Sequence, residues 1–266
     1  MKLKINILSL FLIVSVQAQE FEIKQSFELP FVPTSSSIDR QGYLYFASQD
    51  GVIEKYDQQG KLQYHFSPQT RASPSLIEAW QGLRIFVYYQ SFQEYLFLNR
   101  FLTESERYNL ESLNLSDFNG LATLSADNNL WLINSNTLLL SKVDINNGEV
   151  LFENYLTLTL GTDQFEPKFI REYQNLLFIS DVNRGIFIFD NLGNFVEKLD
   201  LENNGFFSFT KNQLITVTSK GIQLTDIYTK TKREISTANL SYQIVFMENN
   251  RFIALSGKRV DILSIN

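Results

Sequence analysis

The chain of 266 residues contains no cysteine and a single histidine, His65. Without cysteine it forms no disulfide and offers no thiol nucleophile. One histidine excludes a zinc site built from cysteine and histidine, excludes a metal cradle of two histidines, and argues against a Ser-His-Asp triad. His65 lies in the segment LQYHF, which we expect to be an outer strand. We therefore expect no cysteine- or histidine-based catalytic or metal site, while carboxylate chemistry and a Ca²⁺ ion held by oxygen ligands stay open.

Positive charge is also scarce. Lysine and arginine total 23 against 29 aspartate and glutamate residues, a formal net charge of −6. No run of five or more like charges occurs. Binding to a phosphate backbone depends on clustered lysine and arginine, so we expect no nucleic-acid partner.

Long apolar runs are missing except at the N-terminus. There Lys2 and Lys4 precede an apolar run from Ile5 to Val16, and the letters VQA that follow match the small-x-small pattern of signal peptidase sites. The run is shorter than the roughly 20 residues that span a bilayer. We predict a signal peptide at residues 1–18, with an uncleaved anchor as the alternative. The mature chain would start at Gln19 with a net charge of −8 and without a transmembrane span.

A Sec-type signal in an Asn-, Ile- and Lys-rich chain predicts export to the periplasm or the outer-membrane periphery of a Gram-negative bacterium, with secretion as the alternative. The absence of cysteine also excludes a lipid on an N-terminal cysteine.

One strand-like run recurs six times. Its copies are LYFAS from Leu44, IFVYY from Ile85, LWLIN from Leu130, LFISD from Leu177, LITVT from Leu214 and FIALS from Phe252. Their spacings of 41, 45, 47, 37 and 38 residues indicate a repeated supersecondary unit. Gly or Asn stands shortly before each copy, and both residues tolerate the positive φ of tight hairpin turns.

Further strand-like runs precede and follow each copy, which makes each unit a four-stranded antiparallel meander. Six such sheets arranged radially form a β-propeller. The sixth unit ends at Asn266 after three strands, which would leave a bare sheet edge. Phe21 to Leu29 alternates like an outer strand and is predicted to complete that blade. We therefore predict one all-β propeller domain over residues 19–266. Two β-sandwich domains would need a linker that the sequence lacks.

Two segments carry a family resemblance. NLLFISDVNRGIFIFDNLGNFVEKL, Asn175 to Leu199, resembles the NHL-type repeat, and DRQGYLYFASQDGVIEKYDQQGKL, Asp39 to Leu62, is similar. VDINNGEVLFE from Val143 resembles the PQQ-like repeat, with Phe152 where that family usually carries Trp. The resemblance implies a six-bladed propeller and little about activity, because propeller repeats form a scaffold for many functions. Signatures of sialidases, WD40 proteins and PQQ dehydrogenases are missing.

Polar loop residues gather on one predicted face of the ring. Turns between second and third strands open on the same face as the connections that precede first strands. The candidates there are Asp50, Asp181 and Arg184 from the turns, and Arg71, Asp117, Asn119, Asp163, Glu166 and Asn204 from the connections. Oxygen ligands of this kind could hold Ca²⁺ near the axis. Propeller lactonases of the SMP-30 type use Glu, Asn and Asp around a central metal, although no ligand matches here residue by residue. Solvated turn residues are the alternative.

Aromatic side chains in a polar frame suggest an interface. In VYYQSFQEYLF, Val87 to Phe97, polar residues surround Phe92, so Phe92 and Tyr89 are expected to face outward as interface anchors, with blade packing as the alternative. Long loops are predicted on the same face at Thr103 to Asn119 and at Gly161 to Pro167. The predicted binding set is Asp50, Arg71, Tyr89, Phe92, Asp117, Asn119, Glu166, Asp181 and Arg184.

These patterns predict an exported, non-catalytic propeller that binds another protein, as a component of a cell-envelope or outer-membrane assembly, with no cofactor. The alternative is a Ca²⁺-dependent lactonase or hydrolase that uses axial carboxylates.

Overall fold

The computed structural model describes residues 21–113, 115, 118–161, 164–237 and 240–265. The predicted signal peptide at residues 1–18 and the predicted mature start at Gln19 lie outside these ranges. Among the helices within them, none combines the length and the apolar character that a membrane span requires.

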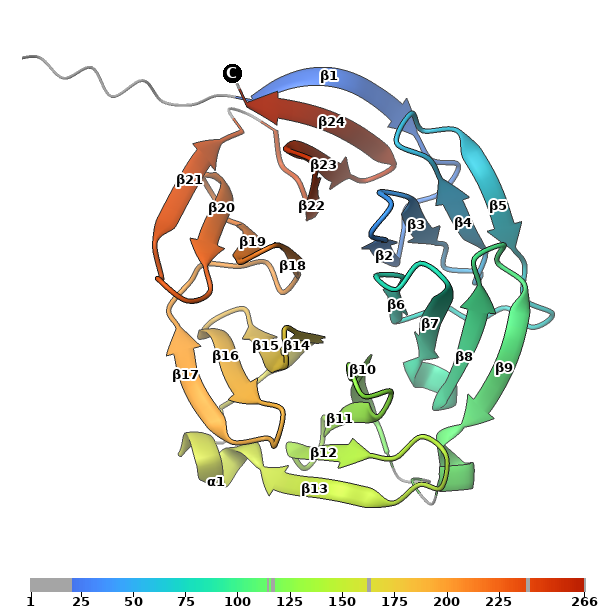
Figure 1. Ribbon diagram of the computed structural model, residues 1–266, viewed down its shortest axis with the longest axis vertical. Helices are drawn as coiled ribbons and strands as arrows, with labels where there is room; N and C mark the ends of the chain where they lie inside the picture. Colours follow the sequence, from blue (N-terminus) through green and yellow to red (C-terminus); the bar gives the residue numbers. More distant parts are fainter. Residues whose placement is uncertain (1–20, 114, 116–117, 162–163, 238–239, 266) are drawn as a thin grey trace, which may run out of the picture.

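Six four-stranded antiparallel sheets form a closed ring (Figure 1). The first three blades comprise β2 (Ser35–Ile38), β3 (Leu44–Ala47), β4 (Ile53–Tyr56) and β5 (Leu62–Phe66); β6 (Leu76–Glu78), β7 (Arg84–Tyr89), β8 (Glu94–Asn99) and β9 (Glu104–Asn109); β10 (Gly120–Leu124), β11 (Leu130–Asn134), β12 (Leu139–Val143) and β13 (Val150–Tyr155). The next two comprise β14 (Pro167–Tyr173), β15 (Leu176–Asp181), β16 (Gly185–Asp190) and β17 (Phe195–Leu199); β18 (Phe207–Thr210), β19 (Gln213–Val217), β20 (Gly221–Asp226) and β21 (Lys232–Ser236). The predicted six-bladed propeller is confirmed.

The sixth blade joins the two ends of the described chain. It contains β22 (Ile244–Glu248), β23 (Arg251–Ser256) and β24 (Arg259–Ile265), and β1 (Phe21–Glu28) pairs antiparallel with β24. The register runs from Phe21 opposite Ile265 to Glu28 opposite Arg259. The predicted closure by the N-terminal strand is confirmed, and the edge of β24 is covered rather than left open to other chains.

The hydrophobic core lies between the blades. Six clusters of buried side chains each draw from two neighbouring sheets, because successive residues of a strand point to opposite faces. In β7, for example, Phe86 and Tyr88 pack toward blade 3, while Ile85, Val87 and Tyr89 pack toward blade 1. The 23 phenylalanines and 12 tyrosines of the chain supply much of this packing area.

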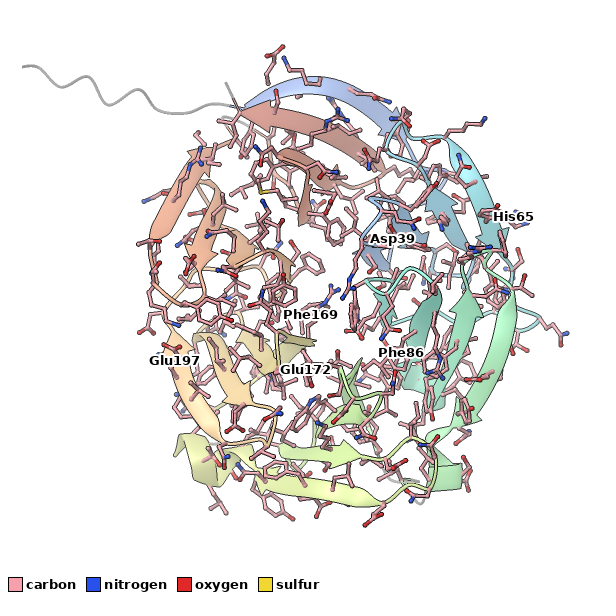
Figure 2. All side chains as sticks on the ribbon, viewed as in Figure 1. Asp39, His65, Phe86, Phe169, Glu172 and Glu197 are labelled. Atoms are coloured by element: carbon pink, nitrogen blue, oxygen red, sulfur yellow. The ribbon has the colours of Figure 1, made fainter. Side chains whose placement is uncertain are left out.

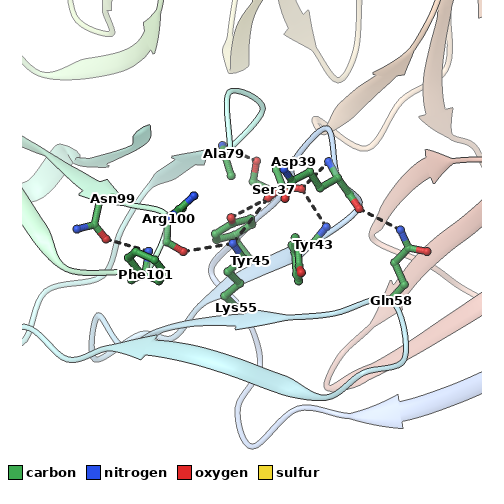
Figure 3. Close-up of polar contacts among 11 residues, drawn as sticks. Ser37, Asp39, Tyr43, Tyr45, Lys55, Gln58, Ala79, Asn99, Arg100 and Phe101 are labelled. Carbon is green, nitrogen blue, oxygen red and sulfur yellow. Dashed lines mark hydrogen bonds and ion pairs between the residues drawn. The ribbon is translucent and has the colours of Figure 1, made fainter. Parts of the chain in front are cut away.

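A buried polar cluster fastens blade 1 to blade 2 (Figure 3). Asp39, in the β2–β3 turn, accepts a hydrogen bond from the Tyr45 hydroxyl at 2.9 Å, and its carboxylate lies 3.9 Å from the Lys55 ammonium. Lys55 also donates to the carbonyl of Arg100 in blade 2 at 3.2 Å. Burial lowers the pKa of Lys55, an effect that Asp39 opposes.

Blade 3 has an equivalent lysine–aspartate pair that contacts the next blade. Lys142, on the third strand of its blade as Lys55 is of blade 1, pairs with Asp127 at 2.7 Å and donates to the carbonyl of Asn191 in blade 4 at 3.4 Å. A buried lysine thus reaches the turn between the third and fourth strands of the next blade in both places.

One predicted loop is wrong. Thr103 to Asn119 contains the strand β9 and the 3₁₀ helix η2 (Leu110–Leu113). The letters ESERYN of β9 are mostly polar because this outermost strand faces solvent along one edge, so apolar alternation gave no signal. The predicted loop from Gly161 ends at Pro167, the first residue of β14, and follows the short helix α1 (Leu156–Leu160).

Candidate functional site

The face predicted to carry the site is formed by the turns between second and third strands and by the connections between blades, as the meander order of the strands requires. On this face a hollow of about 630 Å³ lies between blades 1 and 2. The connection from β5 to β6 borders one side, and β7, β8, β9 and the 3₁₀ helix η1 (Gln90–Phe92) border the other. Figure 1 shows β5 and β9 next to each other on the outer edge of the ring. This feature is termed the blade 1–2 hollow.

Tyr89 lines the hollow but does not face outward. It is only 2% exposed, because its position in β7 places its ring with Ile85 and Val87 in the core between blades 1 and 2. The expected outward orientation of Tyr89 is therefore wrong. Its hydroxyl is enclosed and has no hydrogen-bond partner among the described residues. Burial raises the pKa of Tyr89 to about 12, with Arg107 opposing this rise and the carboxylates of Glu104 and Glu94 adding to it.

Phe92 occupies the rim of the hollow and is 47% exposed, in agreement with its polar sequence context. It ends η1, and the next residue, Gln93, has a φ of 52° and donates its N–H to the Gln90 carbonyl at 3.2 Å. This tight turn holds Phe92 away from the core. Its role as a binding anchor stays a prediction.

An ion-pair network lines the side of the hollow formed by blade 2. Arg107 donates to Glu94 at 3.1 Å and to both oxygens of Glu104, at 2.9 and 3.1 Å. Hydrogen bonds from the guanidinium to Glu104 raise the pKa of Arg107. None of these three residues was predicted as part of a site, because charged residues on outer strands look the same in sequence whether they face only solvent or line a hollow.

Asp50 and Arg71 lie beside the hollow. Their side chains form an ion pair at 3.7 Å and are 63% and 85% exposed, so the pair contributes little to stability. Gly51, next to Asp50, approaches the β5–β6 connection so closely that a Cβ would meet the Ala72 carbonyl oxygen at 2.5 Å. The β3–β4 turn therefore packs directly on the segment that borders the hollow.

Asn119 lies on the other side of blade 2, where its side chain accepts a hydrogen bond from Gln90 at 3.3 Å. It connects the β7–β8 turn to the segment before β10. Asp117 and Asp163 lie outside the described residues.

The remaining predicted residues gather at blade 4, away from the hollow. Asp181 is 1% exposed, and its carboxylate accepts the backbone N–H groups of Asn183, Arg184 and Glu166 at 2.9 to 3.0 Å. These contacts engage both oxygens of Asp181 in forming the turn.

Glu166 pairs with Lys168 at 3.6 Å. The guanidinium of Arg184 lies 5.8 Å from the Phe187 ring centroid, and its Nη1 is enclosed without a partner among the described residues.

Two buried carboxyl side chains on the innermost strands β6 and β14 bind groups of blade 3. Glu78 accepts hydrogen bonds from the Thr123 hydroxyl and the Leu124 N–H, at 2.5 and 3.0 Å. Glu172, labelled beside the central opening in Figure 2, accepts from Ser125 and from the Trp131 indole, at 2.5 and 2.6 Å. In the part of the chain that the structure describes, no three His, Asp or Glu side chains are grouped to hold a metal ion. His65 lies on the perimeter, as expected.

Fold and site together define the chain as a six-bladed β-propeller. Similar solved structures include virginiamycin B lyase from Staphylococcus aureus, with a TM-score of 0.61, 12% identity, and coverage of 92% of this chain and 99% of that one. BamB from Moraxella catarrhalis has a TM-score of 0.51, 11% identity, and coverage of 92% and 99%. The Cps50 (Swd1) β-propeller domain from Myceliophteria thermophila has a TM-score of 0.65, 12% identity, and coverage of 92% and 100%.

At these identities the likeness establishes the fold alone, and it confirms the resemblance to propeller repeats at that level. No protein-family model and no curated protein matches this chain.

Proposed function

We propose that the chain is an exported, non-catalytic interaction module of a cell-envelope assembly, and that it binds another protein at the blade 1–2 hollow. The observation that carries the proposal is the hollow itself, with the half-exposed ring of Phe92 at its rim and the unpartnered hydroxyl of Tyr89 in its lining. Exposed aromatic side chains next to a depression are typical anchors of protein interfaces.

The scaffold supports this use of the surface. Phe92 and the β5–β6 connection project from sheets whose core residues are nearly fully buried, so the surface is held rigid and little ordering entropy is lost on binding. The charged side chains of the hollow, Glu94, Glu104 and Arg107, are already paired with one another, an arrangement that suits recognition rather than proton transfer. The N-terminal sequence pattern supports the export part of the proposal.

Site-specific photo-crosslinking in the native cell envelope tests the proposal. A photoreactive phenylalanine analogue at position 92 is expected to give a discrete crosslinked adduct with another protein. The matched control replaces Leu83, which is 68% exposed on the β6–β7 turn of the opposite face. Adducts of equal yield at both positions, or none at position 92, would contradict the proposed docking surface.

A further inference from the structure

The blade 1–2 hollow has a distinct chemical character. Glu104 and Arg107 pair in register with Leu98 and Leu96 of β8, whose side chains belong to the core between blades 1 and 2. Both charged side chains therefore project on the blade 1 side of the sheet, where Glu94 also lines the hollow. Two carboxylates thus share one guanidinium, and the charged lining has a formal charge of −1.

The carboxylate of Glu94 can accept further hydrogen bonds. Arg107 donates to its Oε2 only, while Oε1 has no hydrogen-bond partner among the described residues. The Glu94 side chain is 29% exposed, so this carboxylate is partly open to solvent. A carboxylate can accept about four hydrogen bonds, which leaves most of its acceptor sites open.

Aromatic rings complete the lining. Phe66, Tyr89 and Phe92 all border the hollow, and the faces of such rings attract cations. The Tyr89 hydroxyl is enclosed by protein atoms, so the Tyr89 side chain contributes to the lining without offering a hydrogen bond to a ligand. An acidic ligand would face the net negative lining without a free cationic partner, since Arg107 is engaged by both glutamates.

From these contacts we infer that the hollow receives a basic side chain, lysine or arginine, from a segment of the partner protein. The charged head would bind Glu94, and the aliphatic stem would lie against Phe92 and Pro68, which supply the apolar part of the lining. This inference rests on the proposed protein-docking function. The net charge of −6 of the whole chain would favour approach of a basic segment.

Three short peptides test the inference on the whole protein. The probe is acetyl-Ala-Leu-Lys-Leu-Ala-amide, and its matched controls carry norleucine or glutamate in place of lysine. Binding is measured by NMR titration at low salt. The lysine peptide is expected to bind about tenfold more tightly than the norleucine peptide, a difference that should shrink as salt screens the exposed charges.

Two variants locate the binding. Glu94→Gln is expected to remove the preference for lysine, whereas Glu106→Gln is expected to keep it. Glu106 lies on the adjacent strand β9 and pairs in register with Phe97, whose ring packs toward blade 3, and it binds Arg84 at 2.7 Å. Because Glu94 is partly exposed, its replacement by glutamine should leave the fold intact, and a thermal melt of each variant verifies this.

Equal binding of the lysine and norleucine peptides would overturn the inference, as would an equal effect of the two variants. Preference for free choline over the lysine peptide would also overturn it, because the site would then serve a small cation. A crosslink at position 92 without a lysine preference would leave the proposed function standing and remove only this inference. A lysine preference without any crosslinked protein would instead remove the proposed function.

Discussion

Tyr88 and Tyr89 are neighbours on β7, yet their hydroxyl groups lie on opposite sides of blade 2 in opposite bonding states. The Tyr88 hydroxyl donates to the Gly120 carbonyl of blade 3 at 3.1 Å, and the Tyr89 hydroxyl has no partner among the described residues. Both side chains are at most 2% exposed. The two residues therefore form a natural matched pair for measuring what a buried hydroxyl contributes.

We predict that Tyr88→Phe lowers the free energy of unfolding by about 1 kcal/mol, because the Gly120 carbonyl loses its partner. Tyr89→Phe should leave stability unchanged or raise it slightly, because it removes a buried polar atom that makes no hydrogen bond. Urea unfolding of both variants measures the difference. A larger loss for Tyr89→Phe would show that its hydroxyl already has a partner in the unliganded protein.

Removal of β1 is predicted to destabilise the whole ring. A protein that starts at Pro30 loses the outer strand of blade 6 and also Phe27, whose ring lies 5.7 Å from that of Tyr56 in blade 1. The exposed edge of β24 should then promote aggregation. Light scattering and thermal unfolding compare this protein with one that starts at Phe21. Identical melting of the two would contradict a structural role for β1.

Glu172→Ala is predicted to lower the free energy of unfolding by about 3 kcal/mol, because the buried Ser125 hydroxyl and Trp131 indole lose their acceptor. Glu153→Ala on the exposed outer strand of blade 3 is the control and should change stability by less than about 0.5 kcal/mol. With Trp80 replaced by phenylalanine, so that emission reports Trp131, the emission maximum should shift to the red only in the Glu172 variant if water enters. An unshifted spectrum with unchanged stability would show that the axial hydrogen bonds are dispensable.

We predict that protonation of Asp226 lowers the free energy of unfolding at acidic pH. The backbone N–H groups of Thr229 and Tyr228 donate to its carboxylate at 2.8 and 2.9 Å and lower its pKa below the ordinary value. Since the folded-state pKa is the lower one, this stabilisation is complete above about pH 4 and disappears as pH falls through the folded-state pKa. Urea unfolding at pH 7 and pH 3 should therefore show a smaller loss in Asp226→Asn than in the unmodified protein. Asp200→Asn, at an 81% exposed carboxylate, is the control.

Calcium is predicted to leave the melting curve unchanged. Asp181, a candidate ligand, has both carboxylate oxygens engaged by backbone N–H groups, and no three acidic or histidine side chains are grouped for a metal within the described residues. Melting in Ca²⁺ and in a chelator measures this. A ligand at 100 times its Kd stabilises by about 2.7 kcal/mol, so a clear rise with Ca²⁺ would favour the lactonase alternative.

The blade pattern could be predicted from sequence because it is local. Short apolar runs recur at a regular spacing and are separated by turns that contain Gly or Asn. This pattern specifies a repeated four-stranded sheet. The polar strand β9 has no such apolar run, so its sequence resembles that of a loop. The pairing of the N-terminal strand could also be predicted, because the last strand of the sixth blade would otherwise have an unpaired edge.

The hollow could not be predicted in the same way. It depends on Glu94 and Arg107 lying on adjacent strands with their side chains on one face, which the register of β8 and β9 determines. The polar residues that follow Tyr89 favour an outward orientation. Because β7 extends to Tyr89, however, its side chain lies on the same face as those of Ile85 and Val87, in the core between blades 1 and 2. The structural role of Asp181 gives no separate signal, because an Asp at a turn looks the same in sequence whether it binds a ligand or its own backbone.

The pairing of β1 with β24 also determines the order in which the ring can form. As the chain emerges from the ribosome N-terminus first, β1 appears before any other strand of the propeller, yet its partner β24 is the last strand to appear. Blades 1 to 5 can assemble in sequence from local pairings, while β1 has to remain unpaired through all of that time. The eight residues of β1 are mostly polar and solvent-facing, and only Phe21, Ile23 and Phe27 are apolar, a composition that suits a segment that must stay free of other strands during this delay.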